Sequence, residues 1–135
     1  MRIAWLILLA TWSLTASGID KVRLQNEAVV QAAVKGIKEN LPQKVDPYTT
    51  MVDVQGRGTT LVYIFKVDAG PKSDTQLIEE GKDRMTRNVT RGTCRNAVRF
   101  LKSGITLVHR YLSAHTGKKL FDVVVRPKDC PALQE

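Results

Sequence analysis

The fold is decided by the stretch from Tyr48 to Val67, which reads YTTMVDVQGRGTTLVYIFKV. Two runs rich in Val, Thr and aromatic residues, 48–54 and 59–67, are joined by Gln55-Gly56-Arg57-Gly58. Such runs around a glycine-containing connection are typical of a β-hairpin. Alternate residues of a strand share a face, so one face of the second run suits a hydrophobic core. Its members are Leu61, Tyr63, Phe65 and Val67.

A helix is predicted on each side of this hairpin. Before it, residues 26–41 carry apolar side chains at the helical period, and Pro42 ends the pattern. After it, Ser73 and Gln76 have the spacing of a capping box, so a long helix should begin there. That helix can continue to Phe100 or Leu101 and stop near Gly104, although Gly92 could bend or divide it.

A second hairpin is predicted near the end of the chain. Its strands are 105–112 and 120–126, and the turn His115-Thr116-Gly117-Lys118 contains a glycine that permits a positive φ. The predicted order is therefore α-β-β-α-β-β. We expect an α+β fold in which a four-stranded antiparallel sheet packs against one long and one shorter helix.

The first 18 residues have the pattern of a signal peptide. Arg2 is followed by an apolar run of about ten residues and then by Ala16-Ser17-Gly18. A membrane-spanning helix takes roughly 20 apolar residues, so an uncleaved anchor is the less favoured alternative. No cysteine near residue 18 could carry a lipid. We predict a signal peptide over 1–18, a single domain over 19–135, and no stable membrane span after cleavage.

The chain has two cysteines, Cys94 and Cys130. In a protein exported to an oxidising compartment, an even number of cysteines favours a disulfide over a metal pair or a redox site. The disulfide would tie the second half of the long helix to the segment beyond the last strand. The sequence predicts neither a metal site nor a cofactor.

The mature domain is basic. Removing 1–18 takes away one cation and leaves 20 Lys and Arg against 13 Asp and Glu, a net charge of +7. Six cations recur every three or four residues on the long helix, which predicts one cationic face. This face could bind an anionic protein or an envelope or host surface component, or it could simply be solvated; no nucleic acid is expected. The six are Arg84, Arg87, Arg91, Arg95, Arg99 and Lys102.

Catalytic motifs are absent from the sequence. There is no nucleophile elbow, phosphate-binding loop or zinc-protease helix. His109 alternates with Leu107 and Tyr111 and is predicted to be a half-buried strand residue. A hydrolase that uses His109, or the carboxylates of Asp53 and Asp122, is the less favoured alternative. We predict that the protein is not an enzyme.

Residues 94–130 combine the two cysteines with Leu101-Lys102-Ser103-Gly104, Tyr111 and Gly117-Lys118. This pattern resembles small exported bacterial proteins with two cysteines. In length, signal peptide and element order, the chain also resembles the secreted quorum-sensing-regulated virulence factor family. That resemblance implies an exported, non-enzymatic bacterial protein linked to virulence, with an α+β fold.

Two functional hypotheses follow. The first is a secreted or periplasmic protein that binds another macromolecule through the arginine face or a sheet edge. The alternative is an inhibitor or accessory factor of an exported enzyme or secretion apparatus. It would act through the hairpin tips at 56–58 and 115–118, because loops on a rigid sheet often carry contacts.

Overall fold

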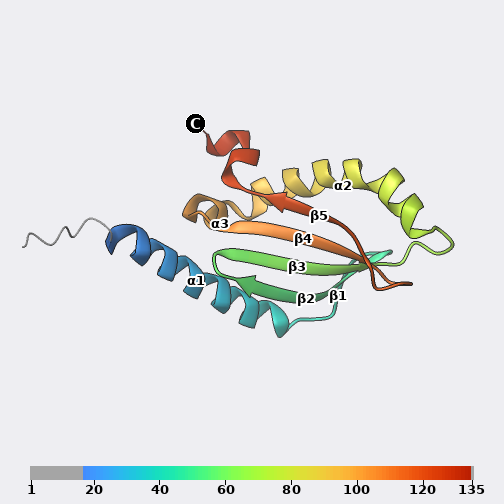
Figure 1. Ribbon diagram of the computed structural model, residues 1–135, viewed down its shortest axis with the longest axis horizontal. Coiled ribbons are helices and arrows are strands. Elements are labelled where there is room, and N and C mark those ends of the chain that lie inside the picture. Colours follow the sequence, from blue (N-terminus) through green and yellow to red (C-terminus); the bar gives the residue numbers. More distant parts are fainter. Residues whose placement is uncertain (1–16, 135) are drawn as a thin grey trace, which may run out of the picture.

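The structure is a computed structural model that describes residues 17–134. The predicted signal peptide therefore lies almost entirely outside the described residues and stays a prediction. The helices are α1 (Ser17–Lys38), α2 (Asp74–Asn96) and α3 (Val98–Ser103), followed near the C-terminus by the short 3₁₀ helices η2 (Pro127–Asp129) and η3 (Pro131–Leu133). The strands are β1 (Gln43–Asp46), β2 (Thr49–Arg57), β3 (Thr60–Val67), β4 (Thr106–Ser113) and β5 (Lys119–Val125). Figure 1 shows their arrangement.

The α+β class is confirmed, but the predicted four-stranded antiparallel sheet is wrong. The sheet has five strands in the order β1-β2-β3-β4-β5, and the central pair, β3 and β4, is parallel. The two predicted hairpins do form, as the antiparallel pairs β2–β3 and β4–β5. The helical crossover α2–α3 returns the chain to the end of the sheet where β3 began, so Thr60 pairs with Thr106.

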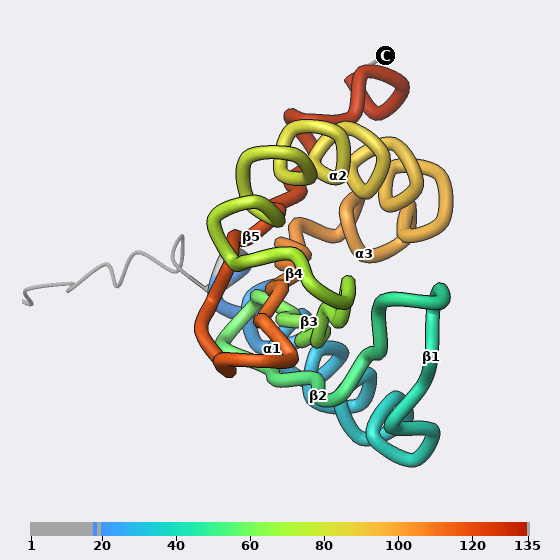
Figure 2. Tube along the Cα trace, turned by 90° about the vertical axis from the view of Figure 1, so that its right-hand side faces the viewer, coloured from blue at the N-terminus to red at the C-terminus, as the bar shows by residue number. Residues whose placement is uncertain are grey.

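The main core lies between one face of the sheet and all three helices. Leu61, Leu107 and Val125 share this face through their register, and Val30 of α1 and Leu101 of α3 complete the same buried cluster. In Figure 2, β1 bends out of the plane of the other strands toward the side of α3. A smaller apolar cluster occupies the opposite face, where Arg110 and Asp122 form an ion pair at 3.0 Å. That cluster consists of Val62, Ile64 and Val108.

The first helix is longer than predicted and begins at Ser17 rather than Asn26. It crosses β2 at Gly56, where an added Cβ would lie 2.7 Å from Val30 Cγ1 and 2.9 Å from Gln31 Nε2. Gly56 therefore provides the close approach on which α1 rests. The turn of the first hairpin instead depends on Gly58, which has a φ of 57°.

The second helix begins as predicted, with both hydrogen bonds of the capping box. The Gln76 backbone N–H donates to Ser73 Oγ at 3.2 Å, and the Ser73 N–H donates to Gln76 Oε1 at 2.9 Å. Gly92 remains helical, and the break comes at Ala97, which separates α2 from α3. The change of direction brings Leu101 into the core, and Gly104 ends α3 with a φ of 95°.

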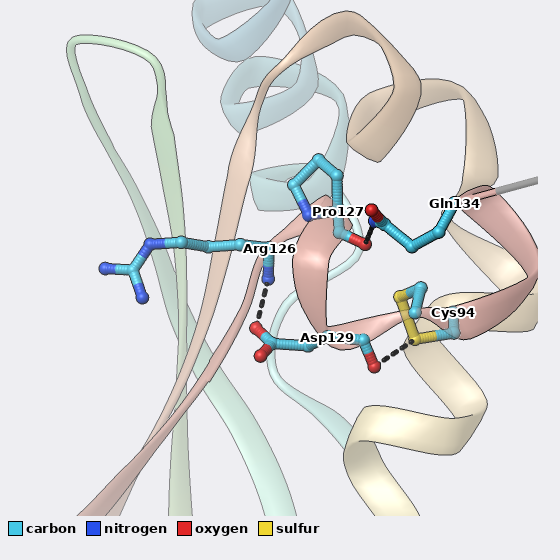
Figure 3. The surroundings of a disulfide bond; sticks show 6 residues. Cys94, Arg126, Pro127, Asp129 and Gln134 are labelled. Carbon is cyan, nitrogen blue, oxygen red and sulfur yellow. Dashed lines mark hydrogen bonds between the residues drawn. A yellow bond between two sulfur atoms is a disulfide. The ribbon is translucent and has the colours of Figure 1, made fainter.

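The predicted disulfide between Cys94 and Cys130 is present, with the two Cα atoms 5.5 Å apart. It fastens α2 to the segment after β5 (Figure 3). The backbone N–H of Arg126 donates to the Asp129 carboxylate at 2.9 Å, and the Gln134 amide donates to the Pro127 carbonyl at 2.7 Å. Residues 126–134 are therefore held in place by hydrogen bonds as well as by the disulfide.

Candidate functional site

A groove runs along α2 on the helix-covered face of the sheet. Its wider part is a hollow of about 700 Å³ between α2, the β1–β2 connection and the neighbouring ends of β3 and β5. A second hollow, of about 440 Å³, lies between α2, α3, β1 and the middle of the sheet. Val89 lines both hollows, and the adjacent residues Val45 and Asp46 line one each. They form one depression, which we call the α2–β1 groove.

The floor of the narrower hollow is apolar and aromatic. Tyr63 and Phe65 of β3 lie beside His109 of β4, with ring centroids 5.1 Å and 5.9 Å from the His109 centroid. Burial lowers the pKa of His109 to about 4, and the Val123 backbone only partly opposes this effect. At neutral pH the imidazole is therefore uncharged. His109 lies in β4 and is partly buried, as predicted.

The two walls of the groove are unlike each other. On the β1 side, Val45 and Tyr48 are 48% and 63% exposed, so apolar side chains stand open to solvent. On the α2 side, Gly81 and Gly92 line the groove, and an added Cβ at either would meet nothing within 4 Å. Glycine inside a helix costs up to about 1 kcal/mol relative to alanine. No neighbouring atom lies close enough to require a glycine at either position. The lack of a side chain at both positions therefore leaves the groove open.

The predicted cationic face is divided by the break at Ala97. Four of its members lie on α2, within an arc of about 80°, and two lie on α3; all six are exposed. Arg84 lines the groove, whereas Arg99 lines a separate hollow between α1 and α3. The structure therefore brings only part of the predicted set to the groove.

The two hairpin tips cannot form one binding surface. Because β3 and β4 are parallel, the turn before β3 and the turn after β4 lie at opposite ends of the sheet (Figure 1). Strands of this length place them about 25 Å apart. The tips at 56–58 and 115–118 are therefore separate surfaces, and a role for either of them in binding stays a prediction.

The candidate catalytic residues His109, Asp53 and Asp122 do not assemble into a site. Nδ1 of His109 has no hydrogen-bond partner in the structure. Asp53 on β2 and Asp122 on β5 are separated by two strands, or about 14 Å, which is wider than a glycosidase carboxylate pair. Over residues 17–134, no group of three or more His, Cys, Asp and Glu side chains is placed to hold a metal ion.

Among residues 17–134, no helix is both long and apolar enough to cross a bilayer.

Sequence reasoning missed the groove because its walls come from distant segments. The β1 wall was not predicted at all, since Gln43–Asp46 is short, exposed and without alternation. One signal was present: Gly81 and Gly92 are 11 residues apart, which places them on one helical face within about 20°.

No family model matches the chain, and no curated protein matches it in sequence. A candidate secreted protein from Pseudomonas aeruginosa has a similar structure, with a TM-score of 0.71 and 13% identity over 81% of this chain and 96% of that one. EpsS, a pilotin of the Vibrio vulnificus type 2 secretion system, gives a TM-score of 0.70 and 12% identity over 82% and 96% of the two chains.

The type II secretion pilotin AspS from Vibrio cholerae is also similar, with a TM-score of 0.64 and 13% identity over 83% of this chain and 98% of that one. At such low identity these likenesses show the fold alone. The predicted resemblance to the quorum-sensing-regulated virulence factor family stays a prediction. What the comparisons establish is that this chain has the α+β fold seen in a candidate secreted protein and in two type II secretion pilotins.

Proposed function

We propose that the protein is an exported accessory factor of a secretion apparatus and binds a segment of another envelope protein in the α2–β1 groove. The observation that carries the proposal is the open groove. It has an apolar floor, two exposed apolar side chains on one wall and, on the other, two glycines at which an added Cβ would meet nothing within 4 Å. A concave, mostly apolar site is the usual form of a binding site.

The likeness of the fold to two type II secretion pilotins supports the accessory role. The predicted signal peptide and the Cys94–Cys130 disulfide support export, since disulfides persist in oxidising compartments. The same observations favour binding over catalysis. A link to virulence rests on the family resemblance alone and is part of this proposal.

Gly92 offers a direct test because it lines the groove and an added Cβ there would meet nothing within 4 Å, so a phenylalanine at this position should occupy space in the groove. The mature, oxidised protein would be used to capture partners from an envelope extract, and the captured proteins would be identified by mass spectrometry. We expect the parent to retain a component of a secretion apparatus and Gly92→Phe to lose it. The measured quantity is the amount of that component retained.

Gly36 provides the matched control. It is also a helical glycine whose Cβ would meet nothing within 4 Å, but it lies on α1, outside the groove. Gly36→Phe should capture the same component as the parent. Equal capture by Gly92→Phe, or a captured protein unrelated to secretion, would refute the proposal.

A further inference from the structure

We propose that the segment bound in the α2–β1 groove is acidic and is oriented, with its carboxylates over Arg91 and Arg95 and its uncharged end beside Glu80. The inference rests on the groove being the binding site, as proposed above. It identifies the chemistry of the partner and the direction in which it lies.

The first argument is the division of charge along α2. Its first ten residues contain Asp74, Glu79, Glu80 and Asp83 against one cation, Lys82. From Arg84 to Lys102 there are six cations and no acidic residue. Near the start of the helix, Glu80 is already paired with Lys72 at 2.6 Å. The start of α2 is therefore mainly acidic, and the rest of α2 with α3 is cationic.

The second argument is the position of three cations at the rim. Arg84 lines the groove, and Arg91 and Arg95 follow it by 7 and 11 residues, so all three lie on one face of α2 within an arc of about 40°; we call this row of cations the arginine rim. They span about 16 Å along the helix. Among the carboxylates of residues 17–134, none forms an ion pair with any of the three. Their guanidinium groups are thus available to carboxylates of a ligand.

The opposite wall favours recognition by side chains over addition of a strand. β1 has only four residues, carries a register shift between Lys44 and Asp46, and lies between Pro42 and Pro47. Short, irregular strands flanked by proline are protected against edge pairing. Val45 and Tyr48 instead offer exposed apolar contacts. An amphipathic segment would place apolar side chains on these two residues and carboxylates on the arginine rim.

The placement of the cations also favours a protein segment over a lipid surface. Arg84 lines the wider hollow together with the exposed Tyr48, and the exposed Val45 lines the narrower one, while Arg91 and Arg95 follow Arg84 along the same face of α2. A flat bilayer would reach the outer face of α2 but not the floor of the groove.

The test uses two synthetic amphipathic peptides with the same apolar stripe, one with glutamates at one end and one with lysines there. Fluorescence anisotropy measures their binding to the mature, oxidised protein. We expect the parent protein to bind the glutamate peptide. The double variant Arg91→Glu, Arg95→Glu should bind the glutamate peptide about tenfold more weakly than the parent does, and it should bind the lysine peptide more tightly. A spin label at the glutamate end should broaden amide signals near Arg95 and leave those near Glu80 unchanged.

The matched control is the double variant Lys82→Glu, Lys128→Glu, which makes the same change in net charge. Lys82 lies about 160° around α2 from Arg84, and Lys128 lies in η2, so both are off the rim. This variant should bind the glutamate peptide like the parent. An equal loss in the control, a preference for the lysine peptide or no peptide binding would refute the inference, as would anionic phospholipid vesicles that bind with the same arginine dependence.

These outcomes are separate from those of the proposed function. If Gly92→Phe abolishes partner capture while the Arg91→Glu, Arg95→Glu variant captures normally, the groove remains the binding site and the acidic partner is wrong. If the arginine variant loses capture while Gly92→Phe retains it, the cationic rim acts without the groove, and both proposals fail.

Discussion

The neutral imidazole of His109 should make the stability of the protein depend on pH. In the folded protein, burial holds the pKa of His109 at about 4, whereas the ordinary value is 6.5. As the pH falls below 6.5, the unfolded chain takes up a proton that the folded chain does not accept. Stability is therefore lost between pH 6.5 and pH 4, and no further loss from this residue occurs below pH 4.

The size of the effect follows from the two pKa values. A difference of one pKa unit corresponds to about 1.4 kcal/mol, so the full effect of His109 is about 3 kcal/mol. Between pH 7 and pH 5, where most carboxylates stay ionised, its share is about 2 kcal/mol. The free energy of unfolding should fall by that amount through this residue alone.

Urea unfolding followed by circular dichroism at pH 7 and pH 5 measures this loss. In His109→Phe the residue no longer titrates, so about 2 kcal/mol of the loss should disappear. The matched control is His115→Gln, which removes the other histidine from an exposed turn and should leave the contribution of His109 intact. An equal loss in the parent and in His109→Phe, or an NMR titration of the His109 ring near pH 6.5, would refute the reasoning.

Three further variants test the packing of the domain. The double variant Cys94→Ala, Cys130→Ala removes a disulfide between positions 36 residues apart. Urea denaturation should show that the free energy of unfolding falls by about 4 kcal/mol. Gly56→Ala should cost about 1 to 3 kcal/mol, seen as a lower melting temperature, because its Cβ would press on α1. At pH 7 Asp122→Asn should lower the free energy of unfolding by about 1 kcal/mol. A hydrogen bond from Arg110 lowers the pKa of the Asp122 carboxyl. The difference between the variant and the parent should therefore vanish as the pH falls through that lowered pKa.

Each of these variants also has a result that would contradict its reasoning. A cysteine double variant as stable as the parent would mean that the unfolded chain gains little freedom when the link is lost. An unchanged melting temperature for Gly56→Ala would mean that α1 can move away from β2. A constant cost for Asp122→Asn from pH 7 to pH 2 would mean that its ionised form is not what stabilises the fold.

The candidate site shows how little of a groove can be read from sequence. The cations of α2 were predicted from their spacing, but their division at Ala97 was not, because the break depends on how α3 packs Leu101 into the core. Val45 and Tyr48 lie on a wall whose strand gave no periodic signal. The relation of both walls to His109 exists only because β1, β3, β4 and α2 meet in space.

The sequence alone determined the features that involve near neighbours in the chain. These include the capping box of α2, the end of the helical region at Gly104, the turns at Gly58 and Gly117, and the class of nearly every element. The composition and the small number of cysteines also predicted the Cys94–Cys130 disulfide correctly. Caps and turns depend on residues a few positions apart, so the printed sequence contains all the interactions that specify them.

Only the tertiary structure decided the parallel pairing of β3 with β4, the added strand β1 and the α2–β1 groove. Side chains alternate with a period of two residues in parallel and antiparallel strands alike, so alternation cannot distinguish the two pairings. The choice is made where the α2–α3 crossover delivers the start of β4 beside the start of β3, and that placement depends on contacts between residues far apart in the chain.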